Sequence, residues 1–314
     1  MSAVPPPEGV FDQGVPWHFG NPLSEQRYLA DGHAAVDMRN HGVLSVAGPD
    51  RLTWLHDLTT QYLRDLAPGD SALALILSPN GHVEHELHIV DDGSTSWLIT
   101  QPGATEALLT YLESMKFMLR VDIADRGSDY VVVGESAHRA EGLGWRVPNP
   151  FAQRGYSLRE SIVPIEDFDA RMRAYDRQAG SWAREALRVA ATMPRIGLDA
   201  DHRTIPNESD WLMSAVHLNK GCYRGQETVA KVNNLGQPPR RLSLVHLDGS
   251  TDELPHHGAV ILHNGKQVGW IGTSAQHHEL GPIATAMLKR SVPAQADLQV
   301  EMSDGQINVR EEAT

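Results

Sequence analysis

The chain has 314 residues, of which 41% are hydrophobic and 21% are charged, and its formal net charge is −13. This composition is that of an ordinary soluble globular protein with room for two domains. Its negative charge excludes broad binding to nucleic acid or to anionic membranes. The single cysteine excludes an intramolecular disulfide. No run approaches the roughly 18 apolar residues of a membrane helix, and the start has no basic or apolar leader, so we expect a cytoplasmic monomer.

The first two fifths of the chain alternate strands with helices. The Pro- and Gly-rich first 20 residues are expected to be loose. The patterns predict helices over 49–63 and 104–119, and strands over 42–48, 72–77, 82–90, 96–100 and 129–134. Because these elements lack a clean βαβ repeat, they indicate an α+β fold rather than a doubly wound sheet.

The rest of the chain divides near residue 236. A helix is predicted over 181–191 with Ser181 as its cap, and the long ordered stretch 193–211 is typical of a functional loop. Short β-type runs follow, with hairpin signals at Asn264-Gly265 and Asp304-Gly305. We therefore predict an α+β region over 1–235, built as two lobes, and a small, partly closed β-barrel over 236–314.

The only cysteine, Cys222, lies in the motif KGCYRGQET (residues 220–228). Lys220 and Arg224 could stabilise its thiolate, which favours a reactive thiol, although Cys222 could equally fill a small gap. From residue 220 to 241 the basic residues outnumber the acidic ones, because Glu227 is the single acid there. An anionic ligand could bind this segment.

The strand around GHVEHELHIV (81–90) carries polar residues at every second position. Strict alternation places Glu84 with Glu86 and His88 on one face, and His85 on the opposite, apolar face. The first set resembles a group of metal ligands, but we interpret it as a solvated outer face. His85, on the apolar side, needs a polar partner or a ligand.

With these segments in place, KGCYRGQETVAKV (220–232) closely resembles the signature of the YgfZ-type folate-binding proteins, in the superfamily of the glycine-cleavage T-protein, an aminomethyltransferase. Four other segments resemble that superfamily in the same order: 36–61, 75–87, 186–208 and 267–290.

This resemblance implies a three-lobed cloverleaf with ferredoxin-like lobes and a C-terminal β-barrel, with tetrahydrofolate or a derivative in the central hole. It implies that the protein assists iron–sulfur cluster assembly or repair in client proteins, with an indirect effect on tRNA modification. Cys222 would be its functional thiol. The expected folate-binding residues are Lys220, Tyr223, Arg224, Gln226, Glu227, His85, Glu84 and Glu208.

Two positions depart from the T-protein pattern. Where T-proteins carry an Asp-Asp pair, this chain has Glu84 and His85, and alternation turns Glu84 away from the face of His85. Ala190 stands where the family usually has a glutamate that hydrogen-bonds the pterin ring, although Glu208 could compensate. Three functions therefore stay open: an iron–sulfur accessory protein, a true aminomethyltransferase, or a folate-binding module without chemistry, in which the basic segment 220–241 pairs with folate carboxylates.

Overall fold

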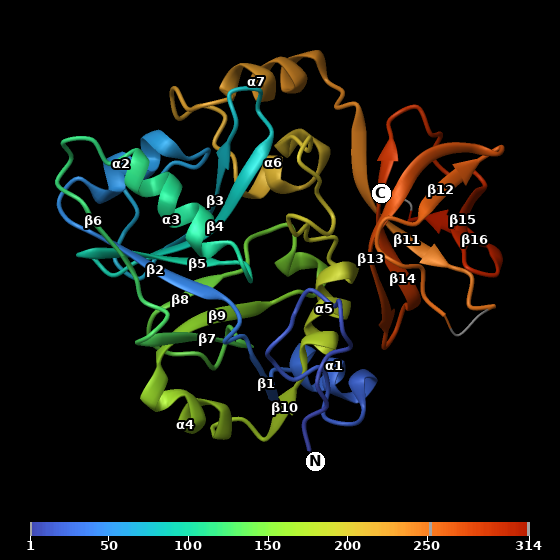
Figure 1. Ribbon diagram of the computed structural model, residues 1–314, viewed down its shortest axis with the longest axis horizontal. Coiled ribbons are helices and arrows are strands. Elements are labelled where there is room, and N and C mark those ends of the chain that lie inside the picture. Colours follow the sequence, from blue (N-terminus) through green and yellow to red (C-terminus); the bar gives the residue numbers. More distant parts are fainter. Residues whose placement is uncertain (1, 251–252, 313–314) are drawn as a thin grey trace.

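A computed structural model of the chain describes residues 2–250 and 253–312. It consists of two five-stranded sheets, stacked as two lobes, and a closed six-stranded barrel beside them (Figure 1). Residues 1, 251–252 and 313–314, which fall within the two predicted domains, lie outside the described residues. The mixed architecture confirms the predicted α+β class.

The first lobe gathers strands that are far apart in the sequence. Its sheet has the order β10-β1-β7-β9-β8, in which only β1 and β10 run parallel. The strands are β1 (Ala34–Asp37), β7 (Tyr130–Ser136), β8 (Gly144–Arg146), β9 (Leu158–Pro164) and β10 (Arg177–Ala179), and the helices are α1 (Pro22–Ala30), α4 (Phe168–Arg173) and α5 (Ser181–Ala190), with 3-10 turns η1 (Ala152–Arg154) and η2 (Ile165–Asp167).

The second lobe is inserted between β1 and β7 of the first. Its antiparallel sheet has the order β3-β4-β5-β2-β6. The strands are β2 (Gly42–Ala47), β3 (Ser71–Leu77), β4 (Val83–Asp91), β5 (Thr95–Thr100) and β6 (Asp122–Asp125), and the helices are α2 (Arg51–Leu58) and α3 (Thr105–Ser114). Both helices are shorter than predicted.

The two sheets pack against each other and share one core. Val36 and Val132 of the first lobe belong to the same buried cluster as Leu75 and Ile99 of the second. Trp145, fully buried between them, donates from Nε1 to the carbonyl of Ala72 over 3.1 Å. Both faces of the second sheet are therefore buried, since α2 and α3 cover its far side with a separate cluster.

A connecting segment leads from the lobes to the barrel. It contains η3 (Pro206–Glu208), α6 (Trp211–Ser214) and α7 (Gln226–Leu235). The barrel is antiparallel and closes where β11 pairs with β16, so it is fully rather than partly closed. Its strands are β11 (Arg240–Leu247), β12 (Val260–His263), β13 (Lys266–His277), β14 (Gly281–Lys289), β15 (Leu298–Met302) and β16 (Gly305–Glu311). The hairpins predicted at Asn264-Gly265 and near Asp304 are both present.

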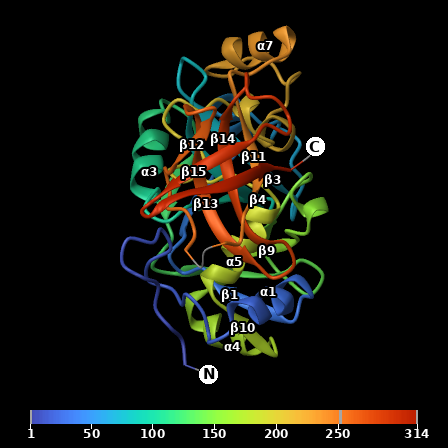
Figure 2. The same cartoon turned by 90° about the vertical axis from the view of Figure 1, so that its right-hand side faces the viewer.

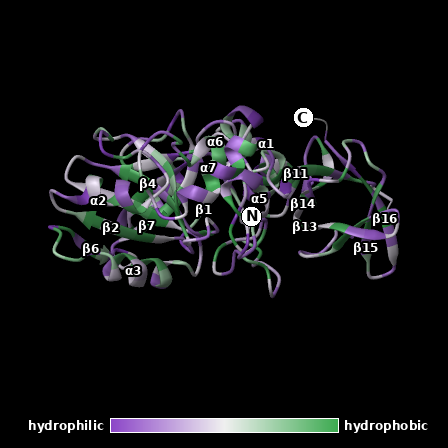
Figure 3. Cartoon of the chain, turned by 90° about the horizontal axis from the view of Figure 1, so that it is seen from above, coloured by the Kyte–Doolittle hydropathy of each residue, from purple (hydrophilic) through white to green (hydrophobic). Residues whose placement is uncertain are grey.

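The barrel covers one side of the lobes, with α7 and the N-terminus at opposite ends (Figure 2). Seen from above, hydrophobic colour follows strands such as β2 and β7 in the interior of the lobes (Figure 3). Among the described residues, none of the helices combines the length and the apolar character needed to cross a membrane.

Two local predictions were wrong. Ser181 is not the cap of α5: the N-cap is Gly180, and the Ser181 hydroxyl donates to the carbonyl of Pro16 over 3.2 Å. The N-terminal segment is held in place rather than loose. Val4 N donates to His18 O over 2.9 Å, and the side chain of Asp12 is buried in the interior of the molecule.

Candidate functional site

A cavity that includes Glu208 lies between the lobes and the barrel, and we call it the interlobe cavity. Its volume is about 1150 Å³. It is bounded by the end of α1, the C-terminal half of α5, η3, the barrel strand β11, the turn between β13 and β14, and the end of β16. Its lining includes Arg27, Asp31, Arg154, Leu187, Ala190, Asn207, Glu208, Asp210, Arg241, His277, Glu279, Arg290, Glu311 and Glu312.

Several polar groups on this lining are available to a ligand. Asn207 is 9% exposed, and its Oδ1 has no hydrogen-bond partner, although its Nδ2 donates to Val229 O over 3.2 Å. Across residues 2–250 and 253–312, the guanidinium groups of Arg27 and Arg290 have no acidic partner. Ala190 also faces this cavity, so the departure from the family pattern leaves open space there.

Glu208 is buried and already engaged in a local structure. Its Oε2 accepts from the backbone N of Ile205 over 3.1 Å, and both oxygens accept from the Arg240 guanidinium at 2.8 and 2.9 Å. Arg240 also pairs with Asp201 at 2.8 Å. Glu208 therefore holds the barrel against η3 as well as lining the cavity.

A smaller cavity of about 160 Å³ opens at the start of β4, and we call it the β4 cavity. Its walls include Phe11, Glu84, His85, Glu86, Gln101, Leu108 and Ile196. Burial lowers the pKa of His85, so this ring is neutral at pH 7, and it lies 5.8 Å from the ring of Tyr111.

A bulge in β4 changes the faces expected from strict alternation. Ile76 pairs with His85 and Leu77 pairs with Val83, so Glu84 is an extra residue without a partner on β3. Such a bulge shifts the alternation by one position. Val83 therefore joins the core between the sheets, whereas Leu87 lies on the opposite side.

The interpretation of this strand as a solvated outer face was wrong. Glu86 and His88 are 6% and 7% exposed, because the first lobe covers this face of the sheet. Within the described ranges, no three His, Cys, Asp or Glu side chains lie where they could together hold a metal ion.

The KGCYRGQET loop packs on the turn that precedes β4. Gly225 has φ +80°, and a Cβ there would lie 2.6 Å from Ser78 O and 2.8 Å from Gly81 Cα. Arg224 reaches Glu84 at 3.4 Å. The fold thus brings three predicted site residues, Glu84, His85 and Arg224, to one edge of the β4 cavity.

Lys220 and Cys222 point to different surroundings. The Lys220 ammonium is buried and donates to the carbonyls of His56 and Thr59 at the end of α2. Burial lowers the pKa of Lys220 to about 8. The Cys222 thiol is exposed, and it lines neither cavity.

The remaining predicted residues of this motif have structural contacts or face solvent. Tyr223 is buried, which raises its pKa to about 12, and its ring lies 5.3 Å from the Lys220 ammonium. Gln226 begins α7, and Glu227 is exposed in its first turn. Arg240 and Arg241 are paired with acids, so much of the positive charge expected over 220–241 is already neutralised.

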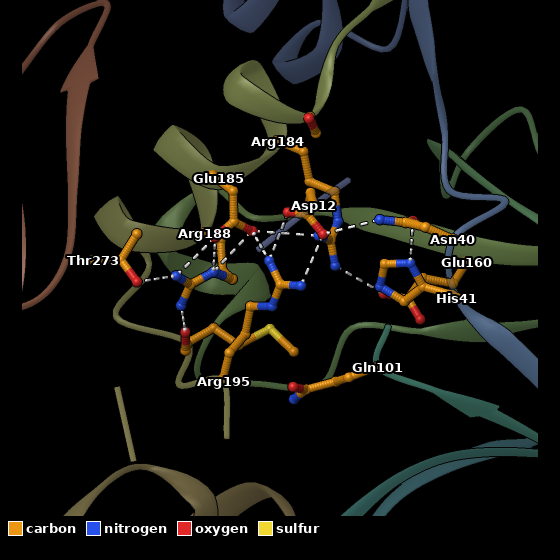
Figure 4. A network of polar contacts seen from close by, with 12 residues as sticks. Asp12, Asn40, His41, Gln101, Glu160, Arg184, Glu185, Arg188, Arg195 and Thr273 are labelled. Atoms are coloured by element: carbon orange, nitrogen blue, oxygen red, sulfur yellow. Dashed lines mark hydrogen bonds and ion pairs between the residues drawn. The ribbon is translucent and has the colours of Figure 1, made fainter. Parts of the chain in front are cut away.

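A chain of buried charges crosses the molecule between the β4 cavity and the barrel. Figure 4 shows its part from Glu160 through the arginines of α5 to Thr273 of the barrel. Every member is less than 9% exposed, and consecutive members lie 2.6 to 3.7 Å apart. We call it the buried charge network; it consists of Asp12, Glu86, His88, Glu160, Arg184, Glu185, Arg188, Arg195 and Asp199.

His88 is the imidazole of this network. Its ring stacks on Trp145 at 3.7 Å, and its Nδ1 lies 2.6 Å from Glu160 Oε2. Burial alone would lower its pKa, but the negative charges of Glu160 and Glu86 outweigh burial and raise it to about 9. His88 is therefore cationic at neutral pH. His41, buried near the Arg184 guanidinium, has its pKa lowered to about 3 and is neutral.

Arg188 and Asp199 join the other end of the network to the barrel. Arg188 pairs with Glu185 and Asp199 at 3.0 and 2.7 Å and donates to Thr273 Oγ1 over 2.8 Å. Asp199 accepts from the Thr273 hydroxyl over 2.8 Å. The network thus joins the N-terminal segment, both lobes and the barrel.

Sequence reasoning did not identify this network. The local signal was the spacing of Arg184, Glu185 and Arg188 on one helix, which is also typical of a solvated helix face. Their partners Asp12 and Glu160 are distant in the sequence, so only the fold shows that all of them are buried.

Three comparisons with known proteins agree on one relationship. Residues 240–312 match the glycine cleavage T-protein C-terminal barrel domain. An aminomethyltransferase of Rippkaea orientalis is 27% identical over 84% of this chain and 82% of its own length. A putative chloroplastic transferase of Arabidopsis thaliana is 24% identical over 83% of this chain and 66% of its own.

A known fold is shared over nearly the whole chain. The glycine cleavage system aminomethyltransferase T of Bartonella henselae covers 97% of this chain, and the chain covers 92% of it, with a TM-score of 0.81 at 16% identity. The barrel domain and the relatives support a relationship to the superfamily of the glycine-cleavage T-protein, and the fold is that of a T-protein.

Proposed function

We propose that this protein binds a reduced folate in the interlobe cavity and serves as an accessory protein in iron–sulfur cluster assembly or repair. The observation that carries folate binding is the interlobe cavity itself, set between the T-protein-like lobes and the matched barrel domain. Its volume is about 1150 Å³. Pockets that bind drug-sized ligands have volumes of about 300–1,000 Å³, so this cavity has room for a folate.

The groups on the lining fit the chemistry of a folate. The free Asn207 Oδ1 can accept from a ring N–H, which would relieve a buried acceptor without a partner. Arg27 and Arg290 can pair with the glutamate carboxylates. Asp31 and Glu279 carry the opposite charge on the same lining, so we expect the carboxylate tail to add only modestly to the affinity.

Calorimetric titration of the anaerobic protein with tetrahydrofolate tests this assignment. We expect saturable binding at one site. Because Ala190 lines the interlobe cavity, A190E supplies the carboxylate that T-proteins are expected to use there, and should tighten binding about tenfold, as one charged hydrogen bond can. A104E, which adds the same charge at the β4 cavity, should leave the affinity within twofold. Absence of saturation at millimolar folate in both the natural chain and A190E would exclude the assignment.

The accessory role rests on the resemblance of KGCYRGQET to the YgfZ-type signature and on the exposure of Cys222. One thiol cannot hold a cluster, since clusters are usually held by four cysteines, so any cluster contact would be shared with a client protein. C222S removes an exposed sulfur and should leave stability within about 0.5 kcal/mol. We expect it to lower the activity of dependent iron–sulfur enzymes in cells, and full activity with C222S would exclude the thiol role.

Aminomethyl transfer is a second candidate, because the Rippkaea orientalis relative over 84% of the chain is named an aminomethyltransferase. Formation of methylenetetrahydrofolate with purified glycine-cleavage partners would establish it. If folate binds while neither activity is found, the protein is a folate-binding module without chemistry of its own.

A further inference from the structure

Glu86 is the residue at which the buried charge network meets the β4 cavity. Glu86 lines the cavity, and its side chain is almost inaccessible to bulk solvent. Gln101 Nε2 donates to Oε2 over 2.6 Å, and Trp211 Nε1 donates to Oε1 over 3.0 Å. Because each carboxylate oxygen can accept more than one hydrogen bond, both retain capacity for a ligand in the cavity.

The charges of the network do not balance. Five members are carboxylates, namely Asp12, Glu86, Glu160, Glu185 and Asp199, and four are cations, namely His88, Arg184, Arg188 and Arg195. A buried charge is costly unless another charge compensates it. One negative charge is therefore left over.

The position of this excess charge follows from the pairing. The three arginines contact Asp12, Glu185, Asp199 and Glu160, and the fourth cation, His88, lies closest to Glu160, at 2.6 Å. Glu86 Oε1 is 3.7 Å from His88 Nε2, which has no hydrogen-bond partner. The carboxylate at the cavity end is consequently the least compensated member.

We propose that the β4 cavity binds a small organic cation, a primary ammonium on an apolar body, with the ammonium held by Glu86. Such a ligand supplies the missing positive charge and two or three N–H donors to the free acceptor sites. Phe11, Leu108 and Ile196 provide apolar walls, and an aromatic ring can also attract a cation. The volume of about 160 Å³ limits the ligand to roughly one substituted ring.

His88 acts in this site as a positioning residue. Its stacking on Trp145 and its contact with Glu160 fix the ring, so Nε2 faces Glu86 and not the cavity. Glu84 lines the same cavity but differs in both respects that matter: it is exposed, and Arg224 lies 3.4 Å from it. Glu84 is therefore the matched control for Glu86.

The test is calorimetric titration of the full chain with benzylammonium chloride and with benzyl alcohol, which has the same shape without the charge. We expect one site that binds benzylammonium at least tenfold more tightly than benzyl alcohol. E86Q should reduce this preference to within twofold, whereas E84Q and E86D should retain it. Equal binding of the two probes, or an unchanged preference in E86Q, would overturn the proposal.

A measurement on the natural chain covers the case in which E86Q does not fold. Intermolecular NOEs from the benzyl ring to the side chains of Phe11 and Ile196 would place the probe in the β4 cavity. NOEs to other residues alone would overturn the proposal. Because the interlobe cavity has a separate lining, a failure here leaves the folate titration unaffected.

Discussion

Asp12 and Arg195 form a bidentate ion pair, with both carboxylate oxygens within 2.8 and 2.9 Å of the guanidinium nitrogens. The two residues are 2% and 3% exposed and are separated by 183 positions in the sequence. Arg195 also contacts Glu185 at 2.8 Å and stacks over Phe11 at 4.5 Å. This pair anchors the N-terminal segment to the centre of the molecule.

D12N should destabilise the protein by about 3 kcal/mol, because it removes one partner of a buried, hydrogen-bonded ion pair and leaves two Arg195 N–H donors without their carboxylate acceptors. Burial raises the pKa of Asp12, but Arg195 lowers it more, so the carboxylate is ionised in the folded chain. Urea unfolding measures the change. D57N is the control, since Asp57 and Arg64 are each about half exposed and 3.2 Å apart; such a pair contributes at most about 1 kcal/mol. Equal effects of D12N and D57N would contradict the anchoring role.

The parts of the fold that sequence patterns predicted are those with a local cause. The strands of the second lobe and the barrel follow short runs rich in apolar residues, and Asn264-Gly265 forms its hairpin because both residues take positive φ. α1 and β8 to β10 carry weaker patterns and were not predicted. They are stabilised by contacts with distant parts of the chain, such as β10 with β1.

The candidate site divides in the same way. The resemblance pointed to Glu84, His85 and Arg224, which do lie together, and to Lys220, whose ammonium is buried on α2 carbonyls instead. Glu86 was assigned to a solvated face because alternation along one strand does not show that the first lobe covers that face. Nothing local in the sequence marks the bulge at Glu84 either. The buried charge network depends on contacts between lobes and could not be read from local patterns.

The pKa of His88 predicts how stability depends on pH. The pKa is raised from its ordinary 6.5 to about 9 in the folded chain. A raised pKa means that the folded state binds the proton more tightly than the unfolded state. The stabilisation is therefore complete below pH 6.5 and is lost as pH rises through 9.

The substitution H88Q separates the pH-dependent stabilisation by His88 from the contributions of other titrating groups. The difference in unfolding free energy between the natural chain and H88Q should shrink steadily from pH 6.5 to 9.5. The exposed His138 provides the control, since H138Q should show a constant difference near zero over the same range. A gap for H88Q that stays constant or widens with pH would mean that His88 is not protonated in the folded chain.

Gly225 should be the glycine on which the KGCYRGQET loop depends most. G225A introduces a Cβ 2.6 Å from Ser78 O in a backbone with φ +80°. The left-handed conformation alone costs about 1–2 kcal/mol, and the overlap with backbone atoms must add to that.

G236A separates the two effects. Gly236 has φ +83°, but a Cβ there meets no atom within 4 Å. We expect G225A to lower the unfolding free energy by at least 1 kcal/mol more than G236A. The rate at which Cys222 is alkylated should change only in G225A, because only there is the loop displaced. Equal losses would indicate that the loop does not pack closely on the turn at Gly81.

Lys220 should contribute to stability through the end of α2. Its ammonium donates to the carbonyls of His56 and Thr59. K220M retains the length of the side chain but removes the donors, so it leaves two carbonyls unsatisfied, at about 1–3 kcal/mol each. Burial of the charged form already lowers the pKa of Lys220 to about 8, and K220M removes that cost of desolvation, which offsets part of the effect.

We expect K220M to lower the free energy of unfolding in urea by about 2 kcal/mol at pH 7. K231M, on the exposed side of α7, should lower it by less than about 0.5 kcal/mol. If K220M were as stable as K231M but lost folate binding in the titration, Lys220 would act on the ligand rather than on the fold.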